Sequence, residues 1–358
     1  MKKIFKNKYK GKYIIFKEAN KSKLKKSKIT KNIYSKIIKL IILFLSFIFI
    51  ISHHLYNNDN NNDRNTNNND NINYSNNSYN NNYIINQGHV ELDYYYRERL
   101  RTIKLWRRVY NESNLVTLED KINWIAIHDV SELKGKCADK ILVHEYSKKI
   151  LNKDICNKIL KVYDDPNEIN ISELPEKFVL KTNHGSGFNI IVTNKAEFDL
   201  ESAKRKLNHW LSIDYGRMNS EFHYSLIKRK VFAEEYIGKE VINYKFFCYH
   251  SIPRFILIYQ KINGTFYRTY YDIKWNLLDW ICVGPPLPNA NYIKPKTFET
   301  MKNYASELSK PFKFVRVDLY EYDNEVRLGE MTFLPFNSFI WCNKPEYDNE
   351  LSKYLKLF

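Results

Sequence analysis

A lysine at the end of an apolar stretch stands just before a short loop of small residues. The stretch 178–181 ends at Lys181, and Gly185-Ser186-Gly187 follows before a second apolar run begins. Small residues let backbone N–H groups turn inward and approach an anion, while a lysine adds a point charge for phosphate oxygens. Two interpretations fit: a phosphate-binding loop, or a plain hairpin between two core strands. No Gly-Lys-Ser/Thr ending follows, so the segment is not a P-loop.

Two segments near the C-terminus place carboxylates where a cation could lie between them. Alternation along a strand puts Arg316 and Asp318 on one face, and it does the same for Glu330 and Thr332. A short turn at 321–324 separates the two stretches, so we expect a hairpin. Adjacent carboxylates repel unless a proton or cation lies between them, and oxygen ligands suit Mg²⁺. The alternative is a solvated acidic hairpin.

A third segment runs from the apolar residues 231–233 into Glu234, Glu235 and Tyr236. Such a hinge could offer backbone groups to an adenine edge and a carboxylate to ribose hydroxyls. A strand that simply ends in solvated acids is the more common alternative for any one segment of this kind.

The elements that must position these residues change in type along the chain. Apolar residues at helical spacing predict helices at 92–110, 118–127 and 138–151. Aromatic and β-branched stretches then predict strands at 178–181, 190–193, 231–236, 244–249, 254–260, 265–271, 314–320 and 327–333. Two further helices, at 200–213 and 298–308, interrupt them. An N-terminal helical region followed by mostly antiparallel sheets with flanking helices predicts an α+β fold.

The N-terminal residues have a different composition from the rest. Residues 1–39 hold fifteen lysines and one acid, so the net charge of +17 leaves only about +3 for the remaining residues. A nucleic-acid partner is therefore not expected. We predict a basic cytosolic tail at 1–36, a transmembrane signal anchor at 37–53, an Asn-rich disordered stem at 54–88 and a folded domain at 89–358.

The lysines before the anchor predict a single-pass type II membrane protein. Its domain would then be luminal or extracellular, in a Golgi-like compartment of the secretory pathway. The alternative for the apolar run is a buried core helix. Five cysteines, at 137, 156, 248, 282 and 342, include no Cys-x-x-Cys pair. This spacing argues against zinc and against a disulfide framework, and an odd number leaves at least one thiol unpaired.

Seven segments, in order between residues 118 and 333, resemble the TupA-like branch of the ATP-grasp superfamily. They are LEDKINW (118–124), CADKILVHEY (137–146), KTNHGSG (181–187), AEEY (233–236), YKFFC (244–248), FVRVD (314–318) and GEMTF (329–333). The resemblance implies an ATP-grasp-like domain with ATP and Mg²⁺ as cofactors. In that family ATP phosphorylates a carboxylate, and an amine or similar nucleophile then attacks the acyl phosphate.

The resemblance also implies roles for individual residues. The nucleotide would be held by Lys140, Lys181, His184, Gly185, Ser186, Gly187, Glu234, Glu235, Tyr236, Glu240 and Lys245, with Glu240 on the ribose. The metal would be held by Asp318, Glu330, Thr332 and Asn337. Arg316 would stabilise charge on the transferred phosphoryl group, with Lys181 as the second catalytic residue. Positioning and charge neutralisation carry most of such a reaction.

Three positions depart from the family pattern. Thr332 stands where many superfamily members have Asn, and a hydroxyl is a poorer metal ligand. Pro335-Phe-Asn337 replaces a Gly-Ser-Gly-like turn, so Asn337 either substitutes for a ligand or marks a loosened site. Asn243 stands where the branch tends to have an acid.

Three functions remain open at this point. The first is an ATP- and Mg²⁺-dependent ligase that joins a carboxylate donor to an amine or glycan acceptor on a cell-surface polymer. The second is a type II membrane glycosyltransferase, although no Asp-x-Asp motif stands at a strand end. The third is a non-catalytic nucleotide-binding protein.

Overall fold

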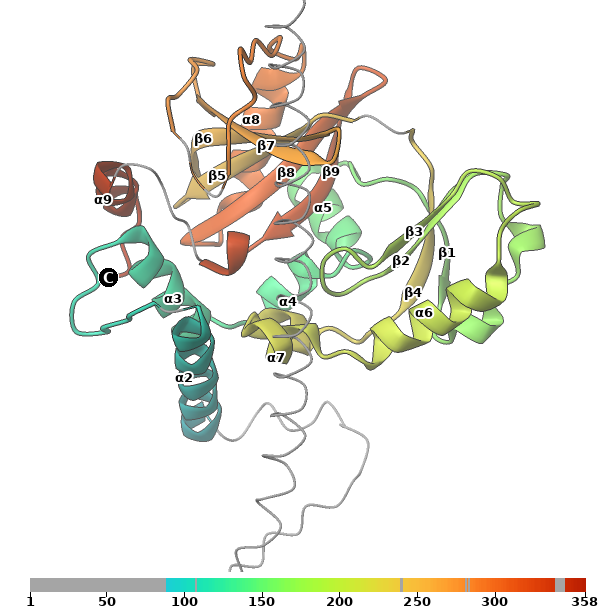
Figure 1. Cartoon of the computed structure of the whole chain (residues 1–358), viewed down its shortest axis with the longest axis horizontal. Coiled ribbons are helices and arrows are strands. Elements are labelled where there is room, and N and C mark those ends of the chain that lie inside the picture. Colours follow the sequence, from blue (N-terminus) through green and yellow to red (C-terminus); the bar gives the residue numbers. More distant parts are fainter. Residues whose placement is uncertain (1–87, 107, 239–240, 281, 283, 339–344) are drawn as a thin grey trace, which may run out of the picture. The chain divides into compact units, whose positions relative to one another are not determined.

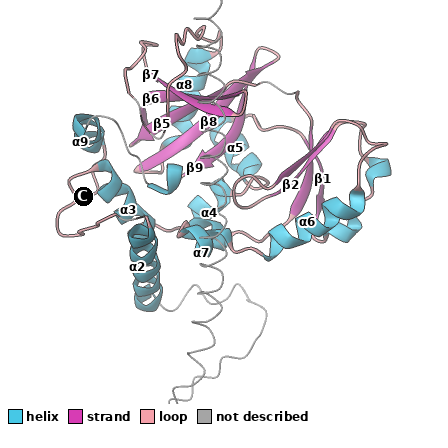
Figure 2. Cartoon of the chain, viewed as in Figure 1, coloured by secondary structure: helices cyan, strands magenta, loops and turns pink. Residues whose placement is uncertain are grey.

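The computed structural model describes residues 88–106, 108–238, 241–280, 282, 284–338 and 345–358. They contain an antiparallel sheet of five strands and another of four, with helices packed against both (Figure 1, Figure 2). The expected α+β architecture with mostly antiparallel sheets is confirmed. The predicted tail and anchor, and nearly all of the stem, lie outside the described residues.

In the described part of the chain, four helices precede the first strand. They are α2 (Gly88–Leu105), α3 (Leu118–His128), α4 (Glu132–Ala138) and α5 (Val143–Leu151). Helix α3 begins with a capping box, in which the side chains of Thr117 and Asp120 each accept the other residue's backbone N–H.

The prediction of a helix over 138–151 is confirmed for residues 143–151 and wrong at its start, because the chain leaves the helical path between α4 and α5. The Asp139 carboxylate accepts the backbone N–H groups of Ile141 at 2.7 Å and Leu142 at 3.2 Å. A short acidic side chain that bonds to nearby backbone competes with the helix in this way. The resulting turn carries Lys140.

The five-stranded sheet has the order β7-β6-β5-β8-β9. Its strands are β5 (Asn243–Tyr249), β6 (Ile252–Ile262), β7 (Thr265–Asp272), β8 (Phe314–Tyr322) and β9 (Glu325–Thr332). Alternate residues of β5 serve two cores. Phe246 and Cys248 belong to the core that contains α8 (Phe298–Ser309), while Phe247 and Tyr249 pack with α3 and α9 (Pro345–Tyr354). Burial on both faces explains the apolar run at 246–249, which ends this strand.

The four-stranded sheet has the order β1-β4-β2-β3. Its strands are β1 (Ile159–Tyr163), β2 (Phe178–Thr182), β3 (Asn189–Val192) and β4 (Val231–Glu235). Helix α6 (Leu200–Ser212) covers one face of this sheet (Figure 1). Leu207 of α6 packs there with Phe178 and Leu180. All eight predicted strands are present, with ends shifted by at most two residues. Strand β1 was not predicted, because it is a short edge strand in which Lys161 and Val162 are exposed.

The remaining sequence predictions meet mixed outcomes. Among the helices that the structure describes, none is both long and apolar enough to cross a bilayer, and the predicted anchor at 37–53 lies outside them. Cys137, Cys156 and Cys248 are free, which confirms the expected unpaired thiols. Cys282, in contrast, is disulfide-bonded. Scattered cysteine spacing therefore does not exclude a single disulfide.

Candidate active site

A cleft of about 330 Å³ is lined by residues from both sheets and from the turn between α4 and α5. It gathers side chains and loop residues that lie far apart in the sequence. Eight residues singled out from the sequence contribute to its wall: Lys140, Lys181, Ser186, Gly187, Glu234, Lys245, Asp318 and Glu330. The structure thus places the lysines, the loop and the paired carboxylates around one space.

On the five-stranded sheet, three charged residues form a row across neighbouring strands. Lys245 of β5 lies opposite Asp318 of β8, and Asp318 lies opposite Glu330 of β9. The expected hairpin between β8 and β9 is confirmed, with Asp323 and Asn324 in left-handed conformation at its turn. The ammonium of Lys245 pairs with Asp318 and lies 4.0 Å from Glu330 Oε1. Only 1% of Asp318 is exposed, which rules out a solvated acidic hairpin.

Arg316 ties the two carboxylates together. Its Nε lies 2.6 Å from Asp318 Oδ1, and its Nη2 lies 2.7 Å from Glu330 Oε1. The same Nη2 donates to the Thr332 hydroxyl at 2.9 Å. Arg316, Asp318, Glu330 and Thr332 therefore share one face of the hairpin, as strand alternation predicts.

The surrounding cations keep Glu330 ionised. Burial by itself raises the pKa of this carboxyl, but Lys245, Arg316 and Lys140 outweigh burial and lower the pKa to about 2. Burial also raises the pKa of Asp318, with Arg316 and Lys245 acting in the opposite direction. Glu330 is consequently a carboxylate throughout the physiological pH range and is available as an anionic ligand.

Lys140 reaches the glycine loop from the turn that Asp139 creates. Its Nζ donates to the Gly185 carbonyl at 2.5 Å, and its backbone N–H donates to the Asn183 carbonyl at 3.0 Å. Asn183 in turn donates from Nδ2 to the Asp139 carboxylate at 2.8 Å. Burial lowers the pKa of Lys140, and the charge of Glu330 opposes that shift. The turn and the loop are therefore fastened to each other.

Lys181 and Glu234 form an ion pair across neighbouring strands of the four-stranded sheet. Val179 lies opposite Glu234 in the β2–β4 register, so Lys181 is the diagonal neighbour of Glu234 on the same face of the sheet. The Asn157 side chain donates to the same Glu234 oxygen at 3.4 Å, and the Tyr320 hydroxyl donates to Asn157 Oδ1. A residue of β8 thereby supports the charge pair of the other sheet.

The glycine loop joins β2 and β3 as a hairpin, and two of its residues also line the cleft. Gly185 and Gly187 have φ values of 73° and 79°, which side-chain-bearing residues rarely adopt. A Cβ atom on Gly185 would lie only 2.8 Å from the ring of Tyr215, whereas one on Gly187 would meet nothing within 4 Å. Both interpretations of the segment therefore agree with its geometry, and anion binding by the loop stays a prediction.

Asn337, expected among the metal ligands, is hydrogen-bonded by Arg99 and does not line the cleft. The Arg99 guanidinium donates to Asn337 Oδ1 at 2.5 Å, to its carbonyl at 2.7 Å and to Ser338 Oγ at 2.5 Å. Arg99 is fully buried and also donates to Asn123 at 2.8 Å. The loop after Pro335 is therefore fixed to the helical region, and the structure does not bring Asn337 to the cleft.

Other predicted residues also lie away from the cleft wall. His184 is buried, its Nε2 lies 3.2 Å from the Ile213 carbonyl, and burial lowers its pKa to about 4. Because side chains alternate along β4, Glu234 faces the cleft while Glu235 accepts the backbone N–H of Lys158 at 3.0 Å. Tyr236 is not among the cleft residues either. Glu240 lies outside the described residues.

The sequence analysis missed several polar residues around the site. Asn157 and Asn189 line the cleft, but Asn157 lies two residues before β1, Asn189 begins β3, and neither matches a motif. Asn243, noted only as a departure, also lines it. The carboxyl of Glu221 is buried, and this burial raises its pKa to about 8 despite the opposing charge of Arg99. No sequence pattern marks Glu221, which lies directly before the aromatic stretch 222–224.

Comparison with known proteins identifies the family. Residues 120–356, about two thirds of the chain, match the family described as TupA-like ATPgrasp. No curated protein matches the chain.

Solved structures give weaker likenesses. The D-alanine–D-alanine ligase from Bacillus anthracis complexed with ATP is 19% identical, with a TM-score of 0.35 over 56% of this chain and 55% of that one. The Helicobacter pylori D-alanine–D-alanine ligase is 18% identical, with a TM-score of 0.35 over 62% of this chain and 61% of that one. PurK, an N5-carboxyaminoimidazole ribonucleotide synthetase solved as its ADP complex, is 12% identical, with a TM-score of 0.34 over 55% of this chain and 45% of that one. This chain thus spans about half the length of these solved proteins. The family match over residues 120–356 confirms the resemblance seen in the sequence, and the chain belongs to the TupA-like ATP-grasp family.

Proposed function

We propose that this protein is an ATP- and Mg²⁺-dependent ligase. In the proposed reaction, a carboxylate oxygen attacks the terminal phosphorus of ATP and ADP leaves. An amine or similar nucleophile on a glycan or cell-surface polymer then attacks the acyl phosphate, and inorganic phosphate leaves as the new bond forms. The acceptor loses its proton to solvent or to a basic group.

The observation that carries the proposal is the convergence of three lysines and two facing carboxylates on one cleft. Lys140, Lys181 and Lys245 come from a helix–helix turn and from two different sheets, yet all three line the same space. Lys181 and Lys245 each pair with a carboxylate there. A bound triphosphate would replace a carboxylate as the anionic partner of each lysine, so that no lysine would be buried without an opposite charge.

The donor set of the hairpin fits Mg²⁺. Asp318 and Glu330 present hard oxygen atoms at opposite positions of two paired strands, and Glu330 is ionised. The Thr332 hydroxyl lies 3.2 Å from Glu330 Oε1. Bound Mg²⁺ would neutralise phosphate charge, while Arg316 fixes both carboxylates and presents its own positive charge beside them.

The membrane setting is part of the same proposal. The lysine-rich tail, apolar run and Asn-rich stem predict a type II anchor. The disulfide at Cys282 supports an oxidising compartment of the secretory pathway, where such bonds persist. In sealed vesicles, the domain should resist added protease until detergent opens the membrane. Digestion without detergent would place the domain in the cytosol.

ADP release by the purified full-length protein tests the catalytic part. We expect release only when ATP, Mg²⁺ and a suitable carboxylate, drawn from amino acids and uronic acids, are present together. Glu330→Gln should abolish this release. Glu325→Gln is the matched control, because Glu325 lies on the same strand but pairs with Lys153 and Arg327 on the surface. ADP formation that does not depend on any carboxylate would contradict the proposal.

A nucleotide-binding protein without ligase activity is the second candidate. It is favoured by the capture of Asn337 by Arg99, which leaves the Thr332 hydroxyl as the third oxygen donor beside the two acids. Binding of ATP without ADP release across the same panel of carboxylates would support this candidate over the ligase.

A further inference from the structure

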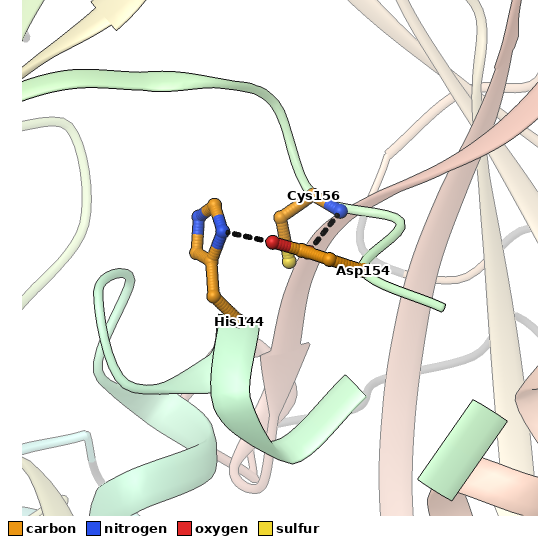
Figure 3. A group of neighbouring side chains, drawn as sticks. All are labelled: His144, Asp154 and Cys156. Atoms are coloured by element: carbon orange, nitrogen blue, oxygen red, sulfur yellow. Dashed lines mark hydrogen bonds and ion pairs between the residues drawn. The ribbon is translucent and has the colours of Figure 1, made fainter. Parts of the chain in front are cut away.

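Three side chains with metal-binding atoms lie close together where α5 meets the segment before β1 (Figure 3). His144 belongs to α5, while Asp154 and Cys156 belong to the segment that leads into β1. One ring nitrogen, one carboxylate oxygen and one sulfur atom all lie within 4.8 Å of one another. His144 and Cys156 also line the cleft, yet the proposed ligase reaction uses none of the three residues.

We propose that His144, Asp154 and Cys156 bind a soft divalent cation, with Zn²⁺ as the best fit. Imidazole, thiolate and carboxylate are the three ligand types that zinc takes in proteins, whereas Mg²⁺ prefers oxygen alone. His144 Nδ1 lies 2.8 Å from Asp154 Oδ2. Two such ligands of tetrahedral zinc stand about 3.3 Å apart at ordinary bond lengths. Small side-chain movements would therefore open room for the ion.

The surrounding contacts hold these residues in position. Asp154 Oδ1 accepts the backbone N–H of Cys156 at 3.0 Å and the hydroxyl of the buried Ser147 at 3.3 Å. Leu328 of β9 donates its N–H to the Ile155 carbonyl at 2.8 Å, which fixes the segment between the two ligands. Supporting bonds of this kind orient metal ligands and strengthen binding.

The charge of the cluster also suits a cation. Asp154 pairs with His144, while the adjacent Lys153 pairs instead with Glu325 on β9. Binding would displace the proton of the Cys156 thiol into solvent, so the ion would meet one thiolate, one carboxylate and a neutral imidazole. The absence of a Cys-x-x-Cys pair does not exclude such a site, because its ligands come from a helix and a loop.

The alternative is that the His144–Asp154 bond only fastens α5 to this segment. Titration of the full-length, metal-free protein in detergent with CoCl₂ separates the two. We expect a saturable thiolate-to-cobalt charge-transfer band that Zn²⁺ removes. Cys156→Ser should abolish the band, and His144→Gln should weaken cobalt binding by about tenfold or more. Circular dichroism should show that both variants stay folded.

Cys248→Ala is the matched control, because Cys248 is also a buried, free thiol but lies in the core beneath α8. Its band should equal that of the unaltered protein. The metal site is refuted by the absence of the band in the unaltered protein, or by its persistence in Cys156→Ser. The readout needs no ATP, so it stands independently of the proposed ligase activity.

Discussion

The two sheets hold their charged residues in different ways. On the four-stranded sheet, Lys181 and Glu234 form a pair with side chains 26% and 11% exposed. On the five-stranded sheet, the Asp318 side chain is 2% exposed and is held by both Arg316 and Lys245. The first arrangement is a single ion pair with a partly exposed lysine, and the second is a network of cations around the fully buried carboxylate of Asp318.

This difference separates what binding requires from what folding requires. A partly solvated ion pair contributes little to stability, so its lysine can exchange partners at low cost. A buried carboxylate needs its cations even when no ligand is present. We therefore expect replacement of Lys181 to affect activity more than stability, and removal of Arg316 to affect folding as well.

The largest expected effect is on stability. Arg316→Met removes the guanidinium that bonds Asp318 through two nitrogens, which should lower the free energy of unfolding by about 3–5 kcal/mol. Lys181→Met should lower it by no more than about 1 kcal/mol. Urea denaturation measures both values. Equal losses in the two variants would show that the sheets do not differ as described.

The next largest effect is on catalysis. Lys181→Ala and Glu330→Gln should each reduce ATP turnover by about 10²–10³-fold, because each removes a charge that faces the transferred phosphate or its metal. Both variants should keep the circular dichroism spectrum of the unaltered protein. Normal turnover in either one would mean that the reactive site is elsewhere.

The glycine loop provides a smaller test. Gly187→Ala should cost about 1–2 kcal/mol for a left-handed backbone conformation. Gly185→Ala should cost more, since its Cβ would also approach the Tyr215 ring at 2.8 Å. Thermal unfolding compares the two. A more damaging change at Gly187 would contradict the loop geometry.

A further expected effect is a pH dependence of stability from Glu221. Burial raises the pKa of Glu221 from 4.5 to about 8. Between these two pH values, the carboxyl is protonated in the folded protein and ionised in the unfolded chain. Stability should therefore fall as pH rises between about 4.5 and 8. Glu221→Gln should flatten this fall in a series of thermal unfolding curves. An unchanged slope would show that Glu221 ionises normally.

The sequence predicted the strands better than the helices and the turns. Alternation and aromatic content located the β8–β9 hairpin, and with it the facing positions of Asp318 and Glu330. Helical spacing continued through residues 138–142, so it could not reveal that the Asp139 side chain ends the helix there.

Long-range contacts set the limit for the site itself. Arg99 and Asn337 meet across a sequence separation of 238 residues, and no local pattern shows that this guanidinium binds the Asn337 side chain. The Glu235 side chain points away from the cleft, and this could have been predicted because side chains alternate along the strand after Glu234. The His144, Asp154 and Cys156 cluster depends on a helix meeting a loop, which residue spacing does not encode.

Thermal unfolding of the full-length protein with different nucleotides tests the central claim, that the cleft binds ATP with Mg²⁺. ATP with Mg²⁺ at about 100 times its dissociation constant should stabilise the fold by about 2.7 kcal/mol. The resulting rise in Tm should disappear in Lys181→Ala, and UDP-sugars should produce none. Stabilisation by UDP-sugars together with no response to ATP would contradict the account and favour a glycosyltransferase.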